Sequence, residues 1–450
     1  MSDKVRPHFG TDGIRGRANE VLTSDMAYGI GRYIGWYYAQ QKGSQANILV
    51  GKDTRLSSNM YEAALAAGIT ASGSNAYLAG FCPTPCVVYL VKQGDFACGV
   101  MISASHNPYY DNGIKVIAGN GTKMDPKVEA AIEGYIYGDE QLPLAVNEQI
   151  GQTIQFPQGL EQYLEHIEKI MGLDLRGMHI ILDVDNGAAT YTAPRLMKKL
   201  GAEVDVINDR PNGQNINNGC GSTHPEMIAA RVREGHYDAG FAFDGDADRL
   251  IAIAPDGAIV DGDKTIYCCG KYLHDKGLLR HDTVVATVMA NLGFFKRIEA
   301  AGLKTAKTKV GDKYVYECMC DNDYVLGGEQ SGHIIFKDLE TTGDGLVTAL
   351  MLLKVIKETG KTLNQLTDDL KVYPQLLVNV QVKDKQHVFD EPLLKQECAK
   401  VEAALGSEGR ILVRPSGTEP LIRVMVEAGS DELCRKYVYQ VVDLIKQNNW

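Results

Sequence analysis

The chain has 450 residues, 44% of them hydrophobic and 23% charged, which is the composition of an ordinary globular protein of roughly two to four domains. Its formal net charge of −11 argues against a general binder of nucleic acid or of anionic membranes, and no apolar run approaches the ~20 residues that span a bilayer. The ten cysteines are scattered without the spacing of zinc ligands, which favours reduced thiols and a cytoplasmic protein.

A glycine-rich segment lies at residues 8–17, where three glycines surround Asp12 and Arg15. Glycine lets the backbone approach a ligand closely, and the planar guanidinium of Arg15 suits a phosphate group. On this segment alone, a glycine-rich hairpin with an exposed arginine is the favoured interpretation.

A strand, a polar exit, a helix, a glycine and a second strand follow one another three times along the chain. The first occurrence begins with a predicted strand at 47–51 and fills residues 47–78. The order returns within residues 179–207, where one helix is expected to run through Leu200, and within residues 283–308. Three βαβ-like units predict three successive α/β domains with mainly parallel strands.

A short apolar strand at Val100–Ser103 is expected to end in a polar loop that carries Ser105 and His106. Pro108 bars the residue before it from the helical conformation, and ligands of α/β proteins bind where strands end. We therefore expect Ser105 to be exposed beside His106, with Lys115 following closely. An ordinary strand-to-turn exit is at least as good an interpretation of this segment alone.

Three aspartates at alternate positions, Asp244, Asp246 and Asp248, follow a strand-like segment. Carboxylates that close repel one another unless a cation or positive side chains lie among them. Their hard oxygen atoms suit Mg²⁺, and a phosphate oxygen is expected to complete the site. A solvated Asp-Gly turn is the alternative, which the strand-like segments on both sides disfavour.

Two further loops carry groups suited to a sugar phosphate. Residues 327–333 combine a carboxylate, a hydroxyl and an imidazole, which suit sugar hydroxyls, although a loop with a satisfied histidine is about equally good. After Tyr373 the pattern becomes that of a smaller α+β domain, whose loop 414–420 offers arginine, hydroxyls and free amides for a phosphate. A tight β-turn is the alternative for that loop.

Eight motifs in one order resemble the bacterial phosphoglucosamine mutases of the α-D-phosphohexomutase superfamily. The motifs are FGTDGIRG, SASHNPYYDNGIK, NINNGCGSTHPE, FDGDADR, VGDKYV, GGEQSGH, TTGDG and RPSGTEPLIRVMVE. The resemblance implies four domains around a central cleft, three of them α/β and the last a smaller α+β domain. We place the domains at residues 1–155, 156–255, 256–371 and 372–450, carrying in turn the phosphoserine, metal, sugar and phosphate loops.

The resemblance also implies a role for each matching residue. Ser105, rather than Ser103, is the expected phosphoserine, and its phosphate is expected to hold one Mg²⁺ together with the three aspartates. The other implied roles are a transfer centre of Arg15, Lys115, His106 and Arg249; a sugar site of Glu329, Ser331 and His333; and a phosphate site of Arg414, Ser416, Gly417, Thr418 and Arg423. His106, Lys115 and His333 remain alternative candidates for proton transfer. Ala247 replaces a frequent glycine and Lys313 a frequent arginine, and neither change is expected to remove a ligand.

The implied reaction interconverts glucosamine 6-phosphate and glucosamine 1-phosphate through the phosphoserine and a glucosamine 1,6-bisphosphate intermediate. This bisphosphate, or a similar one, is expected to serve as primer. The reaction leads to UDP-N-acetylglucosamine and cell-wall synthesis. A phosphomannomutase/phosphoglucomutase is the alternative enzyme. A non-catalytic regulator that binds sugar phosphates is a remote one, because it requires loss of the serine or the carboxylates. The expected partners are phosphosugars, without nucleic acid or membrane. The sequence leaves open whether the chain forms a homodimer.

Overall fold

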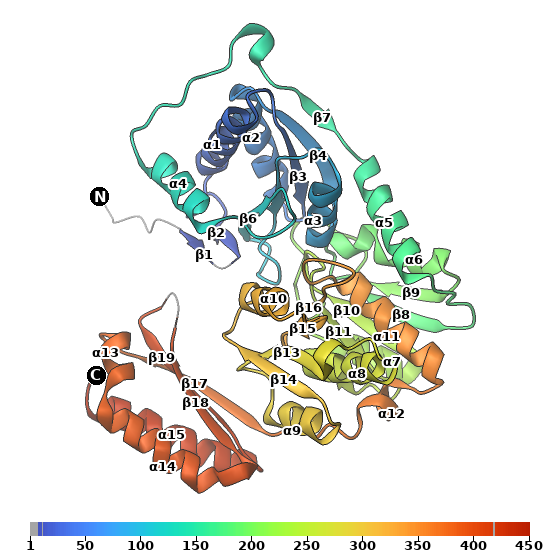
Figure 1. Cartoon of the computed structure of the whole chain (residues 1–450), viewed down its shortest axis with the longest axis vertical. Coiled ribbons are helices and arrows are strands. Elements are labelled where there is room, and N and C mark those ends of the chain that lie inside the picture. Colours follow the sequence, from blue (N-terminus) through green and yellow to red (C-terminus); the bar gives the residue numbers. More distant parts are fainter. Residues whose placement is uncertain (1–7, 11, 417–418) are drawn as a thin grey trace. The chain divides into compact units, whose positions relative to one another are not determined.

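The computed structural model describes residues 8–10, 12–416 and 419–450. The chain forms two compact units, the first containing the residues up to Met289 and Leu303–Thr367, and the second containing Ala290–Gly302 and Asp368–Trp450. The first unit carries three mixed sheets and the second a sheet of three strands (Figure 1). This organisation confirms the prediction of three α/β domains followed by a smaller α+β domain.

The first domain is built on a seven-stranded sheet of order β1-β2-β6-β5-β3-β4-β7. Its strands are β1 (Phe9–Gly10), β2 (Gly13–Arg17), β3 (Asn47–Lys52), β4 (Asn75–Phe81), β5 (Cys98–Ile102), β6 (Asp111–Ala118) and β7 (Thr153–Gln155). Its helices are α1 (Ser24–Lys42), α2 (Ser58–Ala71), α3 (Thr84–Gln93) and α4 (Pro126–Tyr137). Strand β3 is parallel to β4 and β5, whereas β6 returns antiparallel to β5 and pairs Lys115 with Met101. This return brings Lys115 back to the end of the sheet that carries the Ser105 loop.

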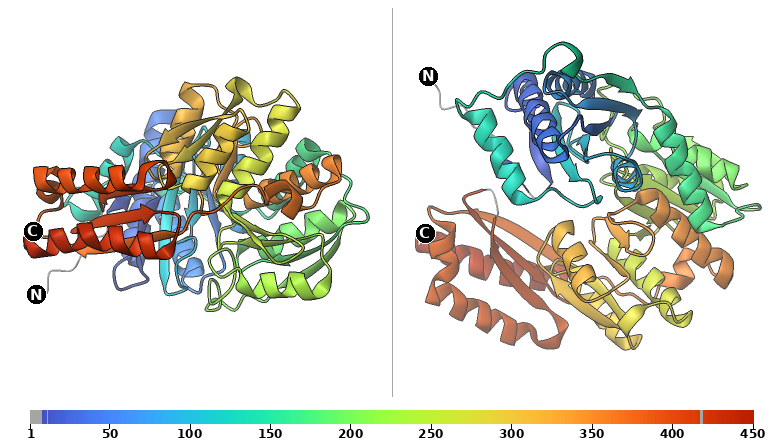
Figure 2. Two further views of the ribbon diagram at one scale, coloured as in Figure 1. Left: turned by 90° about the horizontal axis from the view of Figure 1, so that it is seen from below. Right: turned by 45° about the horizontal axis from the view of Figure 1, so that its top comes forward.

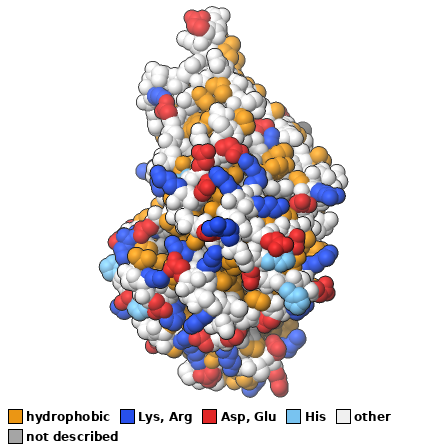
Figure 3. All heavy atoms as spheres, turned by 90° about the vertical axis from the view of Figure 1, so that its right-hand side faces the viewer, with side chains coloured by type: hydrophobic (Ala, Val, Ile, Leu, Met, Phe, Trp, Pro, Cys, Tyr) orange, Lys and Arg blue, Asp and Glu red, His pale blue; other side chains and the backbone are white. Residues whose placement is uncertain are grey.

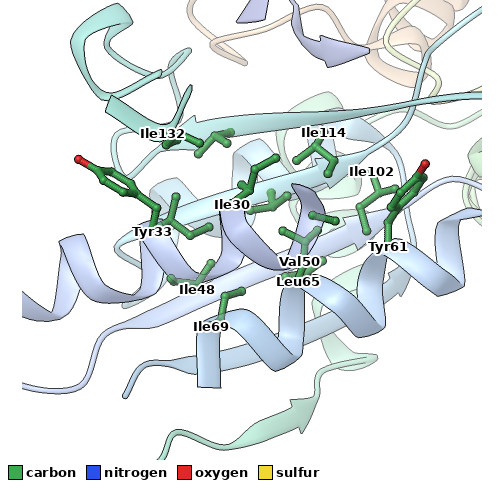
Figure 4. Close-up of a cluster of buried hydrophobic side chains, with 14 of the residues drawn as sticks. Ile30, Tyr33, Ile48, Val50, Tyr61, Leu65, Ile69, Ile102, Ile114 and Ile132 are labelled. Atoms are coloured by element: carbon green, nitrogen blue, oxygen red, sulfur yellow. The ribbon is translucent and has the colours of Figure 1, made fainter. Parts of the chain in front are cut away.

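The core of this domain lies between the sheet and the helices α1 and α2. Ile30 of α1 and Leu65 of α2 point toward Ile48 and Val50 of β3, and all four side chains are fully buried (Figure 4). A β-carbon at Gly68 would overlap the carbonyl oxygen of Tyr28. The absence of a side chain at this position therefore allows α1 and α2 to pack closely. The buried apolar surface therefore holds β3 and β5, and with them the loops at their ends, in fixed positions.

The second domain is built on a five-stranded sheet of order β12-β11-β10-β8-β9, in which β8 is parallel to β9 and β10. Its elements are β8 (His179–Asp183), β9 (Glu203–Ile207), β10 (Ala239–Phe243), β11 (Leu250–Ile253), β12 (Ile259–Val260), α5 (Gln158–Met171), α6 (Ala193–Lys199) and α7 (Glu226–Gly235). The prediction of one helix through Leu200 is wrong, because a 3₁₀ turn at Ala188–Tyr191 precedes α6. Pro194 lies in the first turn of α6, a position that favours the start of a new helix.

The third domain has a four-stranded sheet of order β14-β13-β15-β16. Its elements are β13 (Thr283–Thr287), β14 (Lys304–Thr308), β15 (Leu326–Gly328), β16 (Ile334–Phe336), α8 (Gly262–Asp275), α10 (Asp312–Asp321), α11 (Gly345–Thr359) and α12 (Leu363–Thr367). None of the helices in the described part of the chain is long and apolar enough to cross a bilayer. Figure 3 shows basic and acidic side chains interspersed over one face of the molecule.

The second unit is an antiparallel sheet of order β17-β19-β18 with helices α14 and α15 side by side on one face (Figure 2). Its elements are α9 (Leu292–Ala300), β17 (Gln375–Gln381), α13 (Lys385–Asp390), α14 (Pro392–Leu405), β18 (Arg410–Pro415), β19 (Leu421–Glu427) and α15 (Asp431–Gln447). Helix α9 belongs to this unit, although it lies between β13 and β14 in sequence. The fully buried Glu427 accepts hydrogen bonds from Leu292 N (2.8 Å) and Arg410 Nε (2.6 Å), which ties α9 to the sheet.

Candidate active site

Ser105 lies in the loop between β5 and β6 and has a left-handed backbone, with φ of 51°. Contrary to the expectation of an exposed side chain, Ser105 is fully buried, because the loop after β10 of the second domain covers it. Its Oγ donates a hydrogen bond to Asp244 Oδ2 at 2.6 Å. The hydroxyl of Ser103 instead donates to Asp53 Oδ2 (2.7 Å) and accepts from Ser105 N (2.9 Å). Of the two serines, Ser105 is therefore the one whose hydroxyl faces the aspartates.

The three predicted metal ligands come together in the loop between β10 and β11. Asp244, Asp246 and Asp248 are buried and each offers an oxygen within 4.8 Å of the others. Burial, together with the negative charges of Asp248 and Asp246, raises the pKa of Asp244 well above its usual value. One oxygen of Asp246 and one of Asp248 are buried without a hydrogen-bond partner. Hard, unsatisfied carboxylate oxygens at this spacing fit a Mg²⁺ ion.

The backbone of the metal loop turns sharply at Ala247, which has φ of 55°. Its N–H donates to Asp244 O at 3.0 Å, which closes the turn and keeps the aspartates on one side. Glycine adopts this conformation without strain, whereas alanine rarely does. Alanine at this left-handed position therefore adds local backbone strain, while the three carboxylates still converge.

Lys115 supplies a positive charge at the edge of the aspartate cluster. Its Nζ lies 2.8 Å from Asp246 Oδ2, 3.2 Å from Asp12 Oδ2 and 3.8 Å from Asp248 Oδ2. Burial acts to lower the pKa of Lys115, but Asp12 and Asp246 outweigh it and hold that pKa above its usual range. Lys115 is therefore a cation at neutral pH, suited to neutralising charge rather than to accepting a proton.

His106 lies between Ser105 and Arg249. Its Nδ1 is 3.3 Å from Ser105 Oγ and accepts a hydrogen bond from Arg249 Nη1 at 3.1 Å. Burial and the adjacent guanidinium lower the pKa of His106 to about 4, so the ring is neutral near pH 7. Arg249 is itself part of the metal loop, where its N donates to Asp244 Oδ1 at 3.2 Å. Arg15 of β2 forms an ion pair with Asp12, which also contacts Lys115.

The predicted sugar-binding residues follow β15. Glu329 is half-buried and its Oε1 accepts from Gly311 N at 3.0 Å, whereas Ser331 is exposed. His333 is buried, and its Nε2 accepts a hydrogen bond from Gly343 N at 3.1 Å. The proton of the ring must then lie on Nδ1, which faces Asp248 Oδ2 at 3.6 Å. His333 therefore links the sugar loop to the loop before α11 and to the metal loop.

The predicted phosphate site lies in the second unit. Arg414 and Arg423 are directly opposite one another on β18 and β19, and burial together with Arg423 lowers the pKa of Arg414. Like charges opposite one another on antiparallel strands repel, and an anion between them removes the repulsion. Ser416 is buried and accepts a hydrogen bond from Arg423 Nη2 at 3.4 Å, whereas Gly417 and Thr418 lie outside the described residues.

A cavity of about 300 Å³ in the first unit lies beside the aspartate cluster. Lys115, Asp248 and His333 line one part of it. Lys123 and Lys313 add positive charge, and Lys123 bridges Asp312 (2.6 Å) and Asp12 (3.6 Å). A volume of this size accommodates a small polar ligand beside the aspartate cluster.

Sequence reasoning missed residues that contact the aspartates or lie beneath the Ser105 loop. Thr84 donates to Asp246 Oδ2 at 2.5 Å, but a threonine at the start of a helix carries no signal of that role. Asp53 and Arg55, in the polar exit of β3, form a buried ion pair beneath the Ser105 loop. Two charged residues directly after a buried strand were the available signal for this pair.

Comparisons with known proteins cover nearly the whole length of the chain. Its domains match models described as phosphoglucomutase/phosphomannomutase alpha/beta/alpha domain I at 6–142, domain II at 161–257 and domain III at 261–373, and the C-terminal domain at 377–444. The chain is 49% identical over 445 residues to a phosphoglucosamine mutase of Lachnospira eligens, covering 98% of this chain and 99% of that protein. It is 47% identical over 440 residues to a phosphoglucosamine mutase of Bacillus subtilis, covering 98% of each.

Solved structures share the fold at lower identity. A phosphoglucomutase/phosphomannomutase family protein of Burkholderia thailandensis matches with a TM-score of 0.80 at 23% identity, covering 99% of this chain and 98% of that one. An N-acetylphosphoglucosamine mutase of Aspergillus fumigatus, in complex with GlcNAc-6P and magnesium, matches with a TM-score of 0.72 at 16% identity, covering 100% and 97%.

Proposed function

Because the chain belongs to the phosphoglucomutase/phosphomannomutase family, we propose that it interconverts glucosamine 6-phosphate and glucosamine 1-phosphate. The observation that carries the proposal is the hydroxyl of Ser105, 2.6 Å from Asp244 within a cluster of three buried aspartates. Relatives that match over nearly their whole length are phosphoglucosamine mutases, which supports glucosamine phosphate as the substrate.

The proposed cofactor is one Mg²⁺ ion, held by Asp244, Asp246 and Asp248 together with an oxygen of phosphorylated Ser105. The unsatisfied oxygens of Asp246 and Asp248 support this ligand set. When bound, the ion would neutralise charge on the phosphoryl group during transfer. The positive charges of Lys115 and Arg249 would neutralise the negative charge that remains on the phosphoryl group.

In the proposed reaction the phosphoryl group of Ser105 passes to O1 of glucosamine 6-phosphate. The bond between Ser105 Oγ and phosphorus breaks, a bond from phosphorus to O1 forms, and the proton of the O1 hydroxyl is transferred to Ser105 Oγ, which becomes a hydroxyl again. The bisphosphate product then turns over and returns its 6-phosphoryl group to Ser105, which releases glucosamine 1-phosphate. Such transfers require mainly positioning and charge stabilisation from the protein. His106, 3.3 Å from Ser105 Oγ, is the nearest candidate for moving the proton.

Glu329 and Ser331 are proposed to bind sugar hydroxyls, with His333 holding their loop in place. Arg414, Ser416, Gly417, Thr418 and Arg423 are proposed to bind the phosphate that is not transferred. The paired guanidinium groups of Arg414 and Arg423 support this assignment. We propose that a chain without phosphate on Ser105 needs a bisphosphate primer. The ten free thiols support a cytoplasmic location.

A coupled assay with glucosamine, glucose and mannose 6-phosphates tests the substrate. We expect the highest kcat/KM for glucosamine 6-phosphate, and the highest value for mannose 6-phosphate would instead identify a phosphomannomutase. Intact-mass measurement of the purified chain tests the phosphoserine. The expected result is one added phosphate that is absent from a Ser105→Ala variant but present in a Ser103→Ala variant.

A further inference from the structure

Two side chains from different domains donate hydrogen bonds to the same two carbonyl groups of the Ser105 loop. Arg55 Nη2 donates to Ser105 O (2.7 Å) and Asn107 O (2.8 Å). Asn217 Nδ2 donates to the same oxygens at 2.8 and 2.9 Å. The loop that carries the reacting hydroxyl is therefore held from both sides through its backbone.

Arg55 fixes the loop to its own domain. The side chain is fully buried, and its Nε donates to Asp53 Oδ2 at 2.8 Å. Its Nη1 donates to Pro108 O and to Asp111 O, at 3.0 Å for Asp111. A buried guanidinium with these partners is a rigid support, because each displaced carbonyl would leave a buried donor unsatisfied.

Asn217 fixes the loop to the domain that carries the aspartates. Its backbone is left-handed, with φ of 56°, and its N–H donates to Asp185 Oδ1 at 3.2 Å. Its segment is joined to the strand before the metal loop, because Ser222 N donates to Phe243 O at 2.8 Å. A β-carbon at Gly245 of the metal loop would lie 2.7 Å from Ser105 O and 3.0 Å from Asn217 Nδ2, so these groups pack together.

We propose that Asn217 is a positioning residue for phosphoryl transfer. Its amide fixes the distance between the Ser105 loop and the metal carboxylates by tying the loop backbone to the aspartates' own domain. This inference rests on the proposed mutase function. Because the amide contacts the Ser105 loop rather than the sugar loop, its loss should slow transfer in both directions and change substrate binding little.

The central test replaces Asn217 by aspartate, which has the same shape and also tolerates a left-handed backbone. An ionised carboxylate cannot donate, and it repels the two carbonyl oxygens. We expect kcat to fall by about 10- to 100-fold in both directions with KM changed by less than about 3-fold, as for a small misplacement of reacting groups. Asn217→Gly, which keeps the backbone conformation, should also lower kcat, and Asn218→Ala at the exposed neighbouring residue should not.

Hydrogen–deuterium exchange separates this inference from the proposed function, because it needs no activity. The peptide covering residues 103–111 should exchange faster in Asn217→Asp than in the wild type and in Asn218→Ala, with Ser105 unphosphorylated in all three. Two results would overturn the positioning role. One is equal exchange of this peptide in all three proteins, and the other is an active wild type together with an Asn217→Asp variant that has the same kcat. A wild type that is inactive on all three hexose phosphates would overturn the proposed function, while the exchange result would still decide the role of Asn217 in holding the loop.

Discussion

Replacing Lys115 by methionine removes the cation from a buried group of carboxylates and keeps a side chain of similar length. The Nζ atom lies within 3.8 Å of oxygens of Asp246, Asp12 and Asp248. Breaking a buried ion pair by removal of one partner costs about 3–5 kcal/mol, because the remaining charge is left uncompensated. At about 2–4 °C per kcal/mol, the midpoint of thermal unfolding should fall by roughly 6–20 °C.

The measurement is thermal unfolding followed by circular dichroism, once in EDTA and once in excess Mg²⁺. We expect the full loss in EDTA and a smaller loss in Mg²⁺, because the metal replaces part of the missing positive charge. Lys271→Met is the matched control, since Lys271 forms an exposed pair with Asp275 one helical turn away, and such pairs are worth only about 0.3–0.5 kcal/mol. A Lys115→Met midpoint within about 1 °C of the wild type in EDTA would refute the reasoning.

Asp246→Asn removes a ligand charge without changing volume, so kcat should fall at least about 100-fold with the fold intact; an unchanged Mg²⁺ dependence of the rate would remove Asp246 from the metal site. Arg414→Ala should raise KM about 10-fold or more through loss of charge-assisted hydrogen bonds, while a bisphosphate still phosphorylates Ser105 in part; a normal KM would argue against the phosphate site. Burial and Glu340 raise the pKa of Asp344 to about 7, so the folded state binds the proton more tightly and stability should fall as pH rises from about 4 through 7. Asp344→Asn, whose Oδ1 can still cap α11 and whose Nδ2 can donate to the Tyr163 hydroxyl, should flatten this decline, and identical pH profiles of unfolding for both proteins would contradict it.

Elements with strong local patterns were predictable from the sequence. The strands Glu203–Ile207 and Lys304–Thr308 end where the predicted units 179–207 and 283–308 end, because a glycine two residues before each strand is a local signal. The division of the helix before Leu200 was missed, although Pro194 was a visible signal for a new helix start.

The residues of the site were predictable where a single motif contains all the groups that act together. The aspartates converge because their spacing within one loop is short. The burial of Ser105 was not predictable, since it depends on a contact with Asp244, which is distant in sequence. The same limit applies to Thr84, whose hydroxyl meets Asp246 only after two domains have packed together.

The attachment of α9 to the second unit has a consequence for the order in which the chain folds. Asn291 exchanges hydrogen bonds with the backbone of Tyr373, at 3.0 and 2.9 Å, and Leu292 N bonds to Glu427. During synthesis α9 leaves the ribosome long before β19, so it must wait for partners made near the end of translation. The third domain and the C-terminal domain therefore cannot mature as two independent pieces, and a nascent chain that stops before β17 leaves α9 without the surface it packs on.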